Sequence, residues 1–264
     1  MITVSELEVV FGQGTPLEKR ALNGVDLKVK DGEFVSIIGS NGAGKSTLLN
    51  AIAGDFPPSR GTIEIGGRDV SGWSTARRAA WVSRVFQDPL AGSCADLTIE
   101  ENLALAAARG TRRGLKRALT PRRRSTFIQR VAELGLGLES RLKDRMALLS
   151  GGQRQATALL MATLSPSQAL LLDEHTAALD PGMAEFVIEL TRRIVADEGH
   201  TALMVTHSMS QALSVGTRTI MLHEGKIMLD VSGEERDSLT VEDLVAKFRQ
   251  MRGQSLDDDK LLTS

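Results

Sequence analysis

The chain has 264 residues, of which 42% are hydrophobic and 25% are charged, and its formal net charge is −1. This is the composition of a soluble globular protein, and the length allows one sizeable core with a smaller lobe. The near-neutral charge excludes a general electrostatic attraction to nucleic acid or membranes. The single cysteine, Cys94, excludes an internal disulfide and fits a reducing compartment.

No targeting or membrane-spanning segment is visible in the sequence. The first residues, MITVSELEVVF, lack the basic start and apolar run of a signal peptide. The longest uncharged stretch, residues 156–172, contains Pro166, which would break a spanning helix. We therefore expect a cytosolic protein, or a subunit bound to one face of a membrane assembly.

The N-terminal part is predicted to consist of strands around one glycine-rich loop. Residues 2–11 and 24–30 alternate apolar and polar side chains, as half-buried strands do. Residues 33–38 (EFVSII) are almost wholly apolar, which is typical of a strand buried on both faces of a parallel sheet. The glycine loop leads into a helix that we expect to end at Gly54, and residues 61–67 alternate again.

From about residue 97 to residue 163 the pattern is helical only. Thr98 and Glu101 form a capping box ahead of one helix, and residues 125–135 repeat the helical period. The parallel-sheet pattern returns after this stretch. We therefore expect one α/β domain that is interrupted by a helical insertion and then resumes.

The C-terminal third alternates strands with helices. Residues 169–173 (ALLLD) form a buried strand, and a helix follows with Asp180 as its cap and Pro181 at its first position. Residues 201–207 and 217–223 are further strands. The chain ends in an expected amphipathic helix and a short acidic tail.

The glycine loop GSNGAGKST has the pattern of a phosphate-binding loop. Gly39, Gly44, Lys45 and Ser46 fit G-x-x-x-x-G-K-[ST] between a strand and a helix. Its backbone N–H groups can surround phosphate oxygens at the positive end of the helix. Lys45 would contact the β- and γ-phosphates, and Ser46 would ligate Mg²⁺. The alternative is a tight strand–helix turn without a ligand.

Polar residues at the ends of other strands complete this predicted site. Asp173 is placed to hold the magnesium shell, and Glu174 to polarise a water for attack on the γ-phosphate. His207 could reach the γ-phosphate as a hydrogen-bond donor. The alternatives are an ordinary strand end with two solvated acids, and a histidine that is merely a satisfied polar group.

A second glycine loop, Ser150-Gly151-Gly152-Gln153, has a capping serine and the bare N–H groups of an anion site. It carries neither a lysine nor a magnesium ligand, so it is half of a phosphate site. We expect it to face a nucleotide bound by a different chain. The alternative is a flexible hinge before a helix.

Together these motifs resemble the ATP-binding cassette (ABC) ATPases of membrane transporters. GSNGAGKST, Gln87 in VFQD, LSGGQRQ, LLLDEH, AALDP and MVTH occur in that family's order and spacing, over about residues 1–231. Within the family, the chain looks like the separately encoded cassettes of bacterial uptake systems, in particular those associated with periplasmic binding proteins for amino acids and similar small solutes.

The resemblance implies a fold and its domain boundaries. The fold class is α/β, a P-loop NTPase (RecA-like) core with an N-terminal antiparallel β subdomain and an inserted α-helical subdomain. Residues 1–90 and 163–232 would form the nucleotide-binding core with its β subdomain. Residues 91–162 would form the helical signature subdomain, and residues 233–264 a C-terminal helix and acidic tail.

The resemblance also implies roles for individual residues. The loop that binds the phosphates of ATP would be Gly39, Ser40, Asn41, Gly42, Ala43, Gly44, Lys45, Ser46 and Thr47. Glu174, with Lys45 and His207, would be catalytic, Glu174 as the general base and His207 as the switch histidine. Ser46, Gln87 and Asp173 would ligate magnesium, and Gln87 would also sense the permease.

Two implied roles concern a paired cassette and the adenine base. Ser150, Gly151, Gly152 and Gln153 would bind ATP across a head-to-tail dimer, with Asp180 in the loop that links the two sites. Phe11 lies where the family stacks an aromatic ring on adenine. The family more often has tyrosine there and this chain contains none, so Phe11 could instead belong to the core.

The helical insertion has one unusual feature, a basic stretch. Between residues 102 and 132 no acidic residue accompanies nine basic ones: Arg109, Arg112, Arg113, Lys116, Arg117, Arg122, Arg123, Arg124 and Arg130. A solvated face is the default interpretation. Contact with anionic headgroups or a permease loop, and contact with nucleic acid, are the functional alternatives.

We therefore predict an ATPase that uses ATP and Mg²⁺, works as a dimer or paired cassette on an integral membrane permease, and serves a substrate-binding protein indirectly. It would be peripheral at the cytoplasmic face of the inner membrane and drive solute transport. The alternative is a soluble ABC-type ATPase acting on ribosomes or nucleic acid. A single cassette, with only about sixty residues between Gln87 and Ser150, argues against that class, and a small-molecule kinase has no use for LSGGQ.

Overall fold

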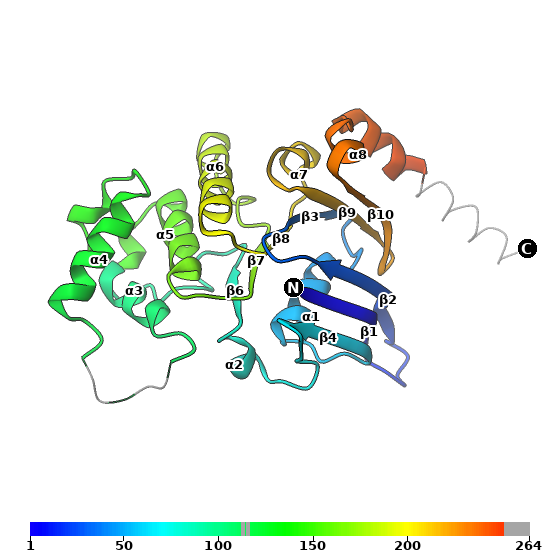
Figure 1. The fold of residues 1–264 in the computed structure, drawn as a ribbon, viewed down its shortest axis with the longest axis horizontal. Helices are drawn as coiled ribbons and strands as arrows, with labels where there is room; N and C mark the ends of the chain where they lie inside the picture. The colour runs from blue at the N-terminus through cyan, green and yellow to red at the C-terminus, as the bar shows by residue number, and fades with distance from the viewer. Residues whose placement is uncertain (112–113, 115–116, 251–264) are drawn as a thin grey trace, which may run out of the picture.

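The computed structural model describes residues 1–111, 114 and 117–250, which form two β-sheets and a group of helices (Figure 1). The larger sheet has the strand order β10-β9-β3-β8-β7-β6. Its neighbouring strands are parallel except for β10, which pairs antiparallel with β9 at one edge. These strands are β3 (Phe34–Gly39), β6 (Val82–Val85), β7 (Ala169–Asp173), β8 (Ala202–Val205), β9 (Arg218–His223) and β10 (Lys226–Ser232).

Alternate side chains of the central strands enter two different cores. Leu171 and Leu203 pack with helix α1 (Lys45–Ala53) and with the smaller sheet. Leu170 and Leu172 pack on the other face, with α5 (Gly151–Thr163) and α6 (Pro181–Glu198). Because both faces are buried, the strands are almost continuously apolar, as the sequence predicted for residues 33–38 and 169–173.

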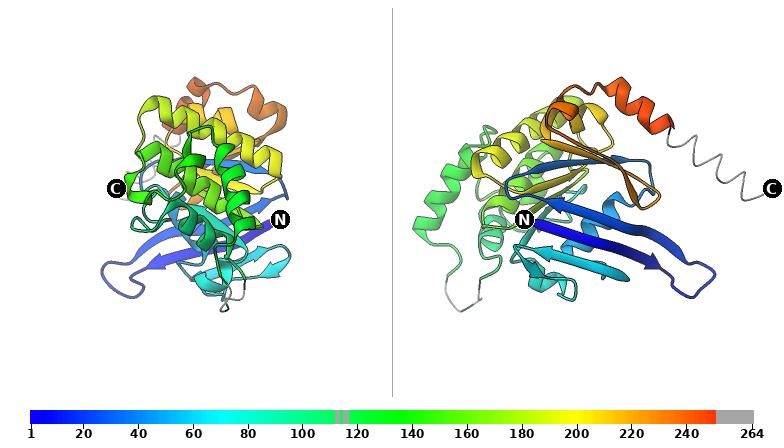
Figure 2. Two further views of the ribbon diagram at one scale, coloured as in Figure 1. Left: turned by 90° about the vertical axis from the view of Figure 1, so that its left-hand side faces the viewer. Right: turned by 45° about the vertical axis from the view of Figure 1, so that its right-hand side comes forward.

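The smaller sheet is antiparallel and has the order β2-β1-β4-β5. Its strands are β1 (Ile2–Phe11), β2 (Lys19–Val29), β4 (Arg60–Ile65) and β5 (Arg68–Asp69). Figures 1 and 2 show this sheet at the opposite end of the molecule from the green helices of the insertion. The predicted fold class, a parallel α/β core with an antiparallel subdomain and inserted helices, is confirmed.

The helices of the insertion lie between β6 and β7 in the sequence. Besides α1, α5 and α6, the named helices are α2 (Thr75–Arg78), α3 (Ile99–Ala107), α4 (Pro121–Ala132), α7 (Met209–Val215) and α8 (Gly233–Asp237), with 3₁₀ turns at Leu138–Ser140 and Met146–Leu148. Residues 241–250 are also helical, as expected for the C-terminal segment. No helix among the described residues is both long and apolar enough to span a bilayer. The subdomain boundaries stay a prediction.

The end of α1 and the starts of α3 and α6 lie where the sequence predicted them. Gly54 ends α1 in the left-handed conformation, with a φ of 89°. Thr98 and Glu101 form the predicted capping box of α3. The side chain of Asp180 caps α6, whose first residue is Pro181. These signals act within one helical turn, so they can be recognised without tertiary information.

Four strands differ from the sequence prediction: β2 begins earlier than expected, and β5, β6 and β10 were not expected. β2 begins at Lys19 rather than at residue 24, because its pairing with β1 continues through Phe11 opposite Lys19. β6 was not predicted, since its four residues include Ser83 and Arg84 and show no long apolar run. It is an edge strand that pairs with β7 alone.

The basic stretch of the insertion is partly neutralised within the fold. Arg109 donates hydrogen bonds to the carbonyls of Ala162 and Ser165. Arg124 makes a bidentate contact with Glu100, at 2.6 and 2.9 Å, and Arg130 pairs with Glu198. The local sequence suggested no partners because these acceptors lie outside residues 102–132. Arg112, Arg113 and Lys116 lie outside the described residues.

A bulge in β1 explains a glycine in β4. The register between these strands shifts between Ser5 and Glu8, and Glu6 has a φ of 45°. A Cβ atom at Gly61 would lie 2.3 Å from the carbonyl oxygen of Glu6 and 2.4 Å from that of Ser5. Backbone atoms cannot rotate away as side chains do, so the bulge requires glycine at this position.

We expect Gly61→Ala to lower the free energy of unfolding by about 3 kcal/mol or more, because a backbone clash adds to the strain of a positive φ. Gly67→Ala is the matched control, since Gly67 has a φ of 73° but no neighbour within 4 Å of an added Cβ. It should cost only about 1–2 kcal/mol. Urea denaturation of both variants measures the difference. Equal losses of stability would mean that the backbone at the bulge shifts to accommodate the added methyl group.

Candidate active site

The glycine loop is clamped between the two sheets. It runs from the end of β3 to the start of α1, where Gly44 is the N-cap residue and no side chain caps the helix. A Cβ on Gly39 would lie 2.2 Å from the carbonyl oxygen of Leu222, and one on Gly44 would lie 2.6 Å from that of Ala21. Glycine is therefore required at both ends of the loop by close backbone contact. The uncapped N–H groups of α1 remain available to an anion.

Lys45 is held by the loop that it follows. Its Nζ donates to the carbonyl oxygens of Gly39 and Ser40, both at 2.9 Å, which leaves one of its three N–H donors for a ligand. Burial lowers the pKa of Lys45, while Glu174 and Asp173 nearby oppose this shift. The ammonium group is thus fixed next to the loop and pointed at the place where phosphates would lie.

Ser46 and Asp173 meet at the end of β7. The Oγ of Ser46 donates to Oδ1 of Asp173 at 3.3 Å. Within the described residues, no cluster of three or more His, Cys, Asp or Glu side chains could hold a metal ion. Magnesium is commonly held by one or two carboxylates together with phosphates and water. The hydroxyl and carboxylate oxygens found here fit that arrangement.

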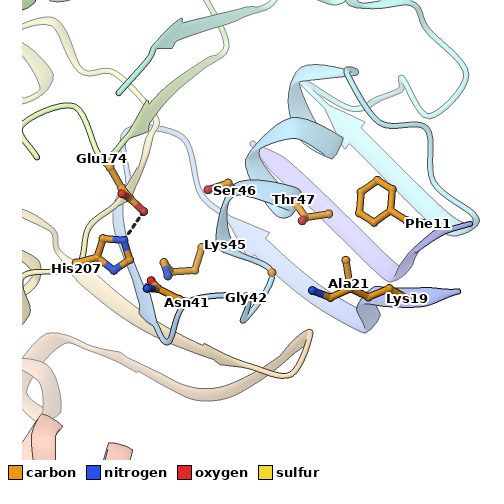
Figure 3. Close-up of a pocket in the computed structure, with 11 residues that line it drawn as sticks. Phe11, Lys19, Ala21, Asn41, Gly42, Lys45, Ser46, Thr47, Glu174 and His207 are labelled. Carbon is orange, nitrogen blue, oxygen red and sulfur yellow. Dashed lines mark ion pairs between the residues drawn. The ribbon is translucent and has the colours of Figure 1, made fainter. Parts of the chain in front are cut away.

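Glu174 and His207 face each other across the site, as Figure 3 shows. Nε2 of His207 lies 2.7 Å from Oε1 of Glu174. Glu174 has a φ of 47°, which is strained for a residue other than glycine. Its backbone N–H donates to the carbonyl oxygen of Val205 at the end of β8. The strained turn therefore aims this carboxylate toward Lys45 and His207.

Lys45, Ser46, Glu174 and His207 line one cavity of about 270 Å³, and Asp173 reaches it through its contact with Ser46 rather than as part of the wall. Its walls come from both sheets and from the glycine loop: Phe11, Lys19, Ala21, Asn41, Gly42, Gly44, Lys45, Ser46, Thr47, Glu174 and His207. Figure 3 shows Phe11 at one end and the Glu174–His207 pair at the other. This shape suits an extended ligand with an aromatic group at one end and anionic groups at the other.

Phe11 lies at the end of β1 and is 37% exposed. Its ring meets that of Phe56 edge to face, with the centroids 5.0 Å apart. This contact leaves part of the Phe11 ring on the wall of the cavity. Phe11 belongs to none of the buried hydrophobic clusters, which argues against the core interpretation. Its role as a stacking surface for adenine stays a prediction.

The second glycine loop lies away from this cavity. None of Ser150, Gly151, Gly152 and Gln153 lines it. Ser150 and Gln153 form a reciprocal capping box at the start of α5, and a Cβ on Gly152 would lie 2.2 Å from Cε of Met183. Such tight packing against α6 argues against a flexible hinge. Asp180 caps α6 and is also absent from the cavity wall.

Gln87 is exposed, and it does not line the cavity either. Its assignment as a magnesium ligand therefore stays a prediction. Sequence reasoning missed Gln155, whose buried side chain donates from Nε2 to the carbonyl oxygen of Phe86 at 3.2 Å. This bond ties α5 to the residue before Gln87. No sequence signal points to it, because 69 positions separate the two partners.

Sequence reasoning also missed His175, which directly follows the candidate base. The side chain is buried and hydrogen-bonds through Nε2 to the hydroxyl of Thr191 at 2.9 Å. Burial lowers the pKa of His175 to about 4, so this imidazole is neutral near pH 7. It anchors the strained turn at Glu174 to helix α6.

Known proteins resemble this chain in sequence and in structure. The ABC transporter family model matches residues 22–177. The tyrosine transport ATP-binding protein of Clostridioides difficile (strain R20291) is 43% identical over 249 residues, covering 94% of this chain and 98% of the relative. The thiamine import ATP-binding protein ThiQ of Yersinia pestis is 38% identical over 205 residues, covering 78% and 82%. A dimeric ATP-binding cassette solved with ADP and Pi has a TM-score of 0.76 and 28% identity, covering 88% and 98%.

The place of Phe11 in the cavity can be tested by nucleotide binding. We expect Phe11→Ala to raise the Kd for ATP by about 5- to 150-fold, since stacking on a base contributes roughly 1–3 kcal/mol. Phe11→Tyr should bind as the wild type does. Isothermal titration calorimetry measures both variants. An unchanged Kd together with a loss of stability would assign Phe11 to the core beside Phe56.

Proposed function

Because the chain belongs to the ABC transporter family, we propose that it drives the uptake of an amino acid of the tyrosine type through a separate membrane permease. It is the ATPase subunit of an ABC import system. The identity of the solute rests on similarity to the C. difficile protein over almost the whole of both chains. Selectivity would reside in the permease and binding protein that this subunit serves.

One observation supports the site assignment above all others. Lys45, Ser46, Asp173, Glu174 and His207 come from the ends of two strands, β7 and β8, and from the start of α1, and they converge on one region. Lys45 and the loop N–H groups would bind the β- and γ-phosphates of ATP. Phe11 would support the adenine at the other end of the cavity. The bound nucleotide would then present its γ-phosphate to Glu174.

Proton transfer is the task assigned to Glu174. Its Oε1 accepts a hydrogen bond from His207 when Nε2 of the imidazole carries the proton, so Oε2 is left to take the proton of an attacking water. As charge develops on the γ-phosphate, His207 would move this N–H hydrogen bond from the carboxylate to a phosphate oxygen. Bound Mg²⁺ would neutralise phosphate charge, held by Ser46 and Asp173.

The second glycine loop supports a shared site. The signature residues 150–153 present the start of α5 away from their own cavity, and the solved cassette with ADP and Pi is a dimer. We infer that two chains pair head to tail, so that each signature loop closes the ATP site of its partner. This arrangement would make hydrolysis dependent on dimer closure.

A second cavity supports contact with a permease. It has a volume of about 400 Å³ and lies beside the Gln87 segment, with Phe86, Leu105, Arg109 and Met161 in its wall. Leu105 is 49% exposed at the wall of this cavity, so it offers apolar surface that a bound segment could cover. A permease segment that fills this groove would place the subunit at the cytoplasmic face of the membrane.

The alternative partner, ribosome or nucleic acid, has less support. Arg109, Arg124 and Arg130 are bound to acceptors within the fold, which reduces the basic surface that a polyanion would need. Retention of the protein by membranes that contain its permease, but not by ribosomes, would favour the transporter assignment. The opposite distribution would overturn it.

Glu174→Gln tests the general base. We expect ATP affinity to persist and turnover to fall by about 10²–10⁴-fold, because the amide cannot accept a proton. With ATP the variant should elute as a stable dimer in size-exclusion chromatography. Glu185→Gln, an exposed position on α6, is the matched control and should hydrolyse ATP normally. More than about a tenth of wild-type turnover in Glu174→Gln would refute the assignment.

The shared site can be tested by mixing two damaged chains. Lys45→Ala and Ser150→Arg each damage every composite site in a homodimer, so each variant alone should lose about 10²–10³-fold in rate. In an equal mixture half of the dimers are heterodimers with one intact site. About a quarter of wild-type activity should therefore return if sites act independently.

Heterodimer formation must be confirmed in this mixture, for example with differently tagged chains. A site built within one chain predicts no recovery and a specific activity that survives dilution. The shared site would be contradicted by a mixture that has confirmed heterodimers but no ATPase activity, together with a wild-type specific activity that does not fall on dilution.

A further inference from the structure

An arginine that the assigned machinery does not use lies next to the proposed magnesium ligand. Arg84 is the third residue of β6, and its side chain is 12% exposed. Its Nη2 donates to Oδ2 of Asp173 at 2.7 Å, and its Nη1 donates to Oδ2 of Asp55 at 2.8 Å. One largely buried guanidinium thus bridges the end of β7 and the turn that follows α1.

The two carboxylate oxygens of Asp173 have different partners. Oδ2 is bound to Arg84, while Oδ1 accepts from the hydroxyl of Ser46. Because a carboxylate is planar, fixing Oδ2 also fixes the direction of Oδ1. Hydrogen bonds between charged groups are about twice as strong as neutral ones. Arg84 therefore turns Oδ1 toward Ser46, the side on which magnesium would bind.

Arg84 also contacts the segment that carries Gln87. Its guanidinium carbon lies 4.6 Å from the ring centroid of Phe86, the residue before Gln87. β6 is an edge strand, and β7 is its one neighbour in the sheet. The Arg84–Asp173 contact is therefore a side-chain link, in addition to the backbone ladder, between the Gln87 segment and the magnesium side of the site.

We propose that Arg84 is a positioning residue that orients Asp173 for Mg²⁺ and couples that orientation to the Gln87 segment. The proposal rests on the proposed function, since it takes Asp173 as a magnesium ligand. Groups that orient metal ligands typically change metal affinity by 10- to 100-fold when removed. If Arg84 only stabilised the fold, its removal would lower the free energy of unfolding and leave the Kd for Mg²⁺ unchanged.

The proposal predicts a loss of metal affinity rather than of nucleotide affinity. In Arg84→Met, which keeps the length of the side chain and removes its charge, the Kd for Mg²⁺ in the presence of a non-hydrolysable ATP analogue should rise by about 10-fold or more. The Kd for the same analogue in EDTA should stay within twofold of wild type. Calorimetry measures both constants, and the electron paramagnetic resonance of bound Mn²⁺ provides a second readout.

Three further variants locate the effect. Arg192→Met removes a surface arginine that pairs with Glu189 on α6, and it should change neither constant. Asp55→Asn weakens the second contact of Arg84, so it should raise the Kd for Mg²⁺ by a smaller factor than Arg84→Met does. This variant keeps a test available if Arg84→Met does not fold. In an Asp173→Ala background, Arg84→Met should have no further effect on the Kd for Mg²⁺.

Each other outcome has a distinct meaning. A Kd for Mg²⁺ within twofold of wild type in Arg84→Met, with reduced stability in urea, would overturn the proposal. It would show that Arg84 only stabilises the fold. Tighter Mg²⁺ binding in Arg84→Met would overturn the proposal too, because it would mean that the positive charge of Arg84 repels the metal ion. If nucleotide binding by the wild type does not respond to Mg²⁺, or Asp173→Ala does not weaken it, the proposed function fails instead.

Discussion

Close backbone contact around the glycine loop is the constraint on which the site depends. Gly39 touches β9 and Gly44 touches β2, so the loop is held by both sheets at once. Any side chain at either position would push the loop away from one of them. The ammonium of Lys45 then binds two carbonyls of this loop. Loop shape, lysine position and helix start are therefore set together by these contacts.

Around this loop the fold gathers charges that would be costly alone. Lys45, Asp173, Glu174 and Arg84 are all largely removed from solvent. A buried charge is tolerated when it is paired and hydrogen-bonded, and here each has an opposite charge or a polar partner nearby. The carboxyl ends of β7 and β8 supply this arrangement, because parallel strands end at the same edge of the sheet.

The second glycine loop shows a different use of the same chemistry. Its capping box and its packing on Met183 fix the start of α5 in the fold, yet its residues do not line the phosphate cavity of their own chain. A fixed, uncharged helix start is suited to completing a site built by another surface. The proposed pairing of two cassettes would give both glycine loops a role without duplicating the lysine or the proposed magnesium ligand.

The sequence by itself determined the features that depend on neighbouring residues. The phosphate loop, the caps at Thr98 and Asp180, the end of α1 and the buried strands all follow from patterns within a few positions. The tertiary structure alone decided the pairing of Arg84 with Asp173, 89 positions apart, and of Gln155 with Phe86. It likewise gave the basic insertion its acidic partners. The reason is physical: a side chain's charge partner is chosen by which strand ends and helix faces the completed fold brings together, and no local pattern records that choice.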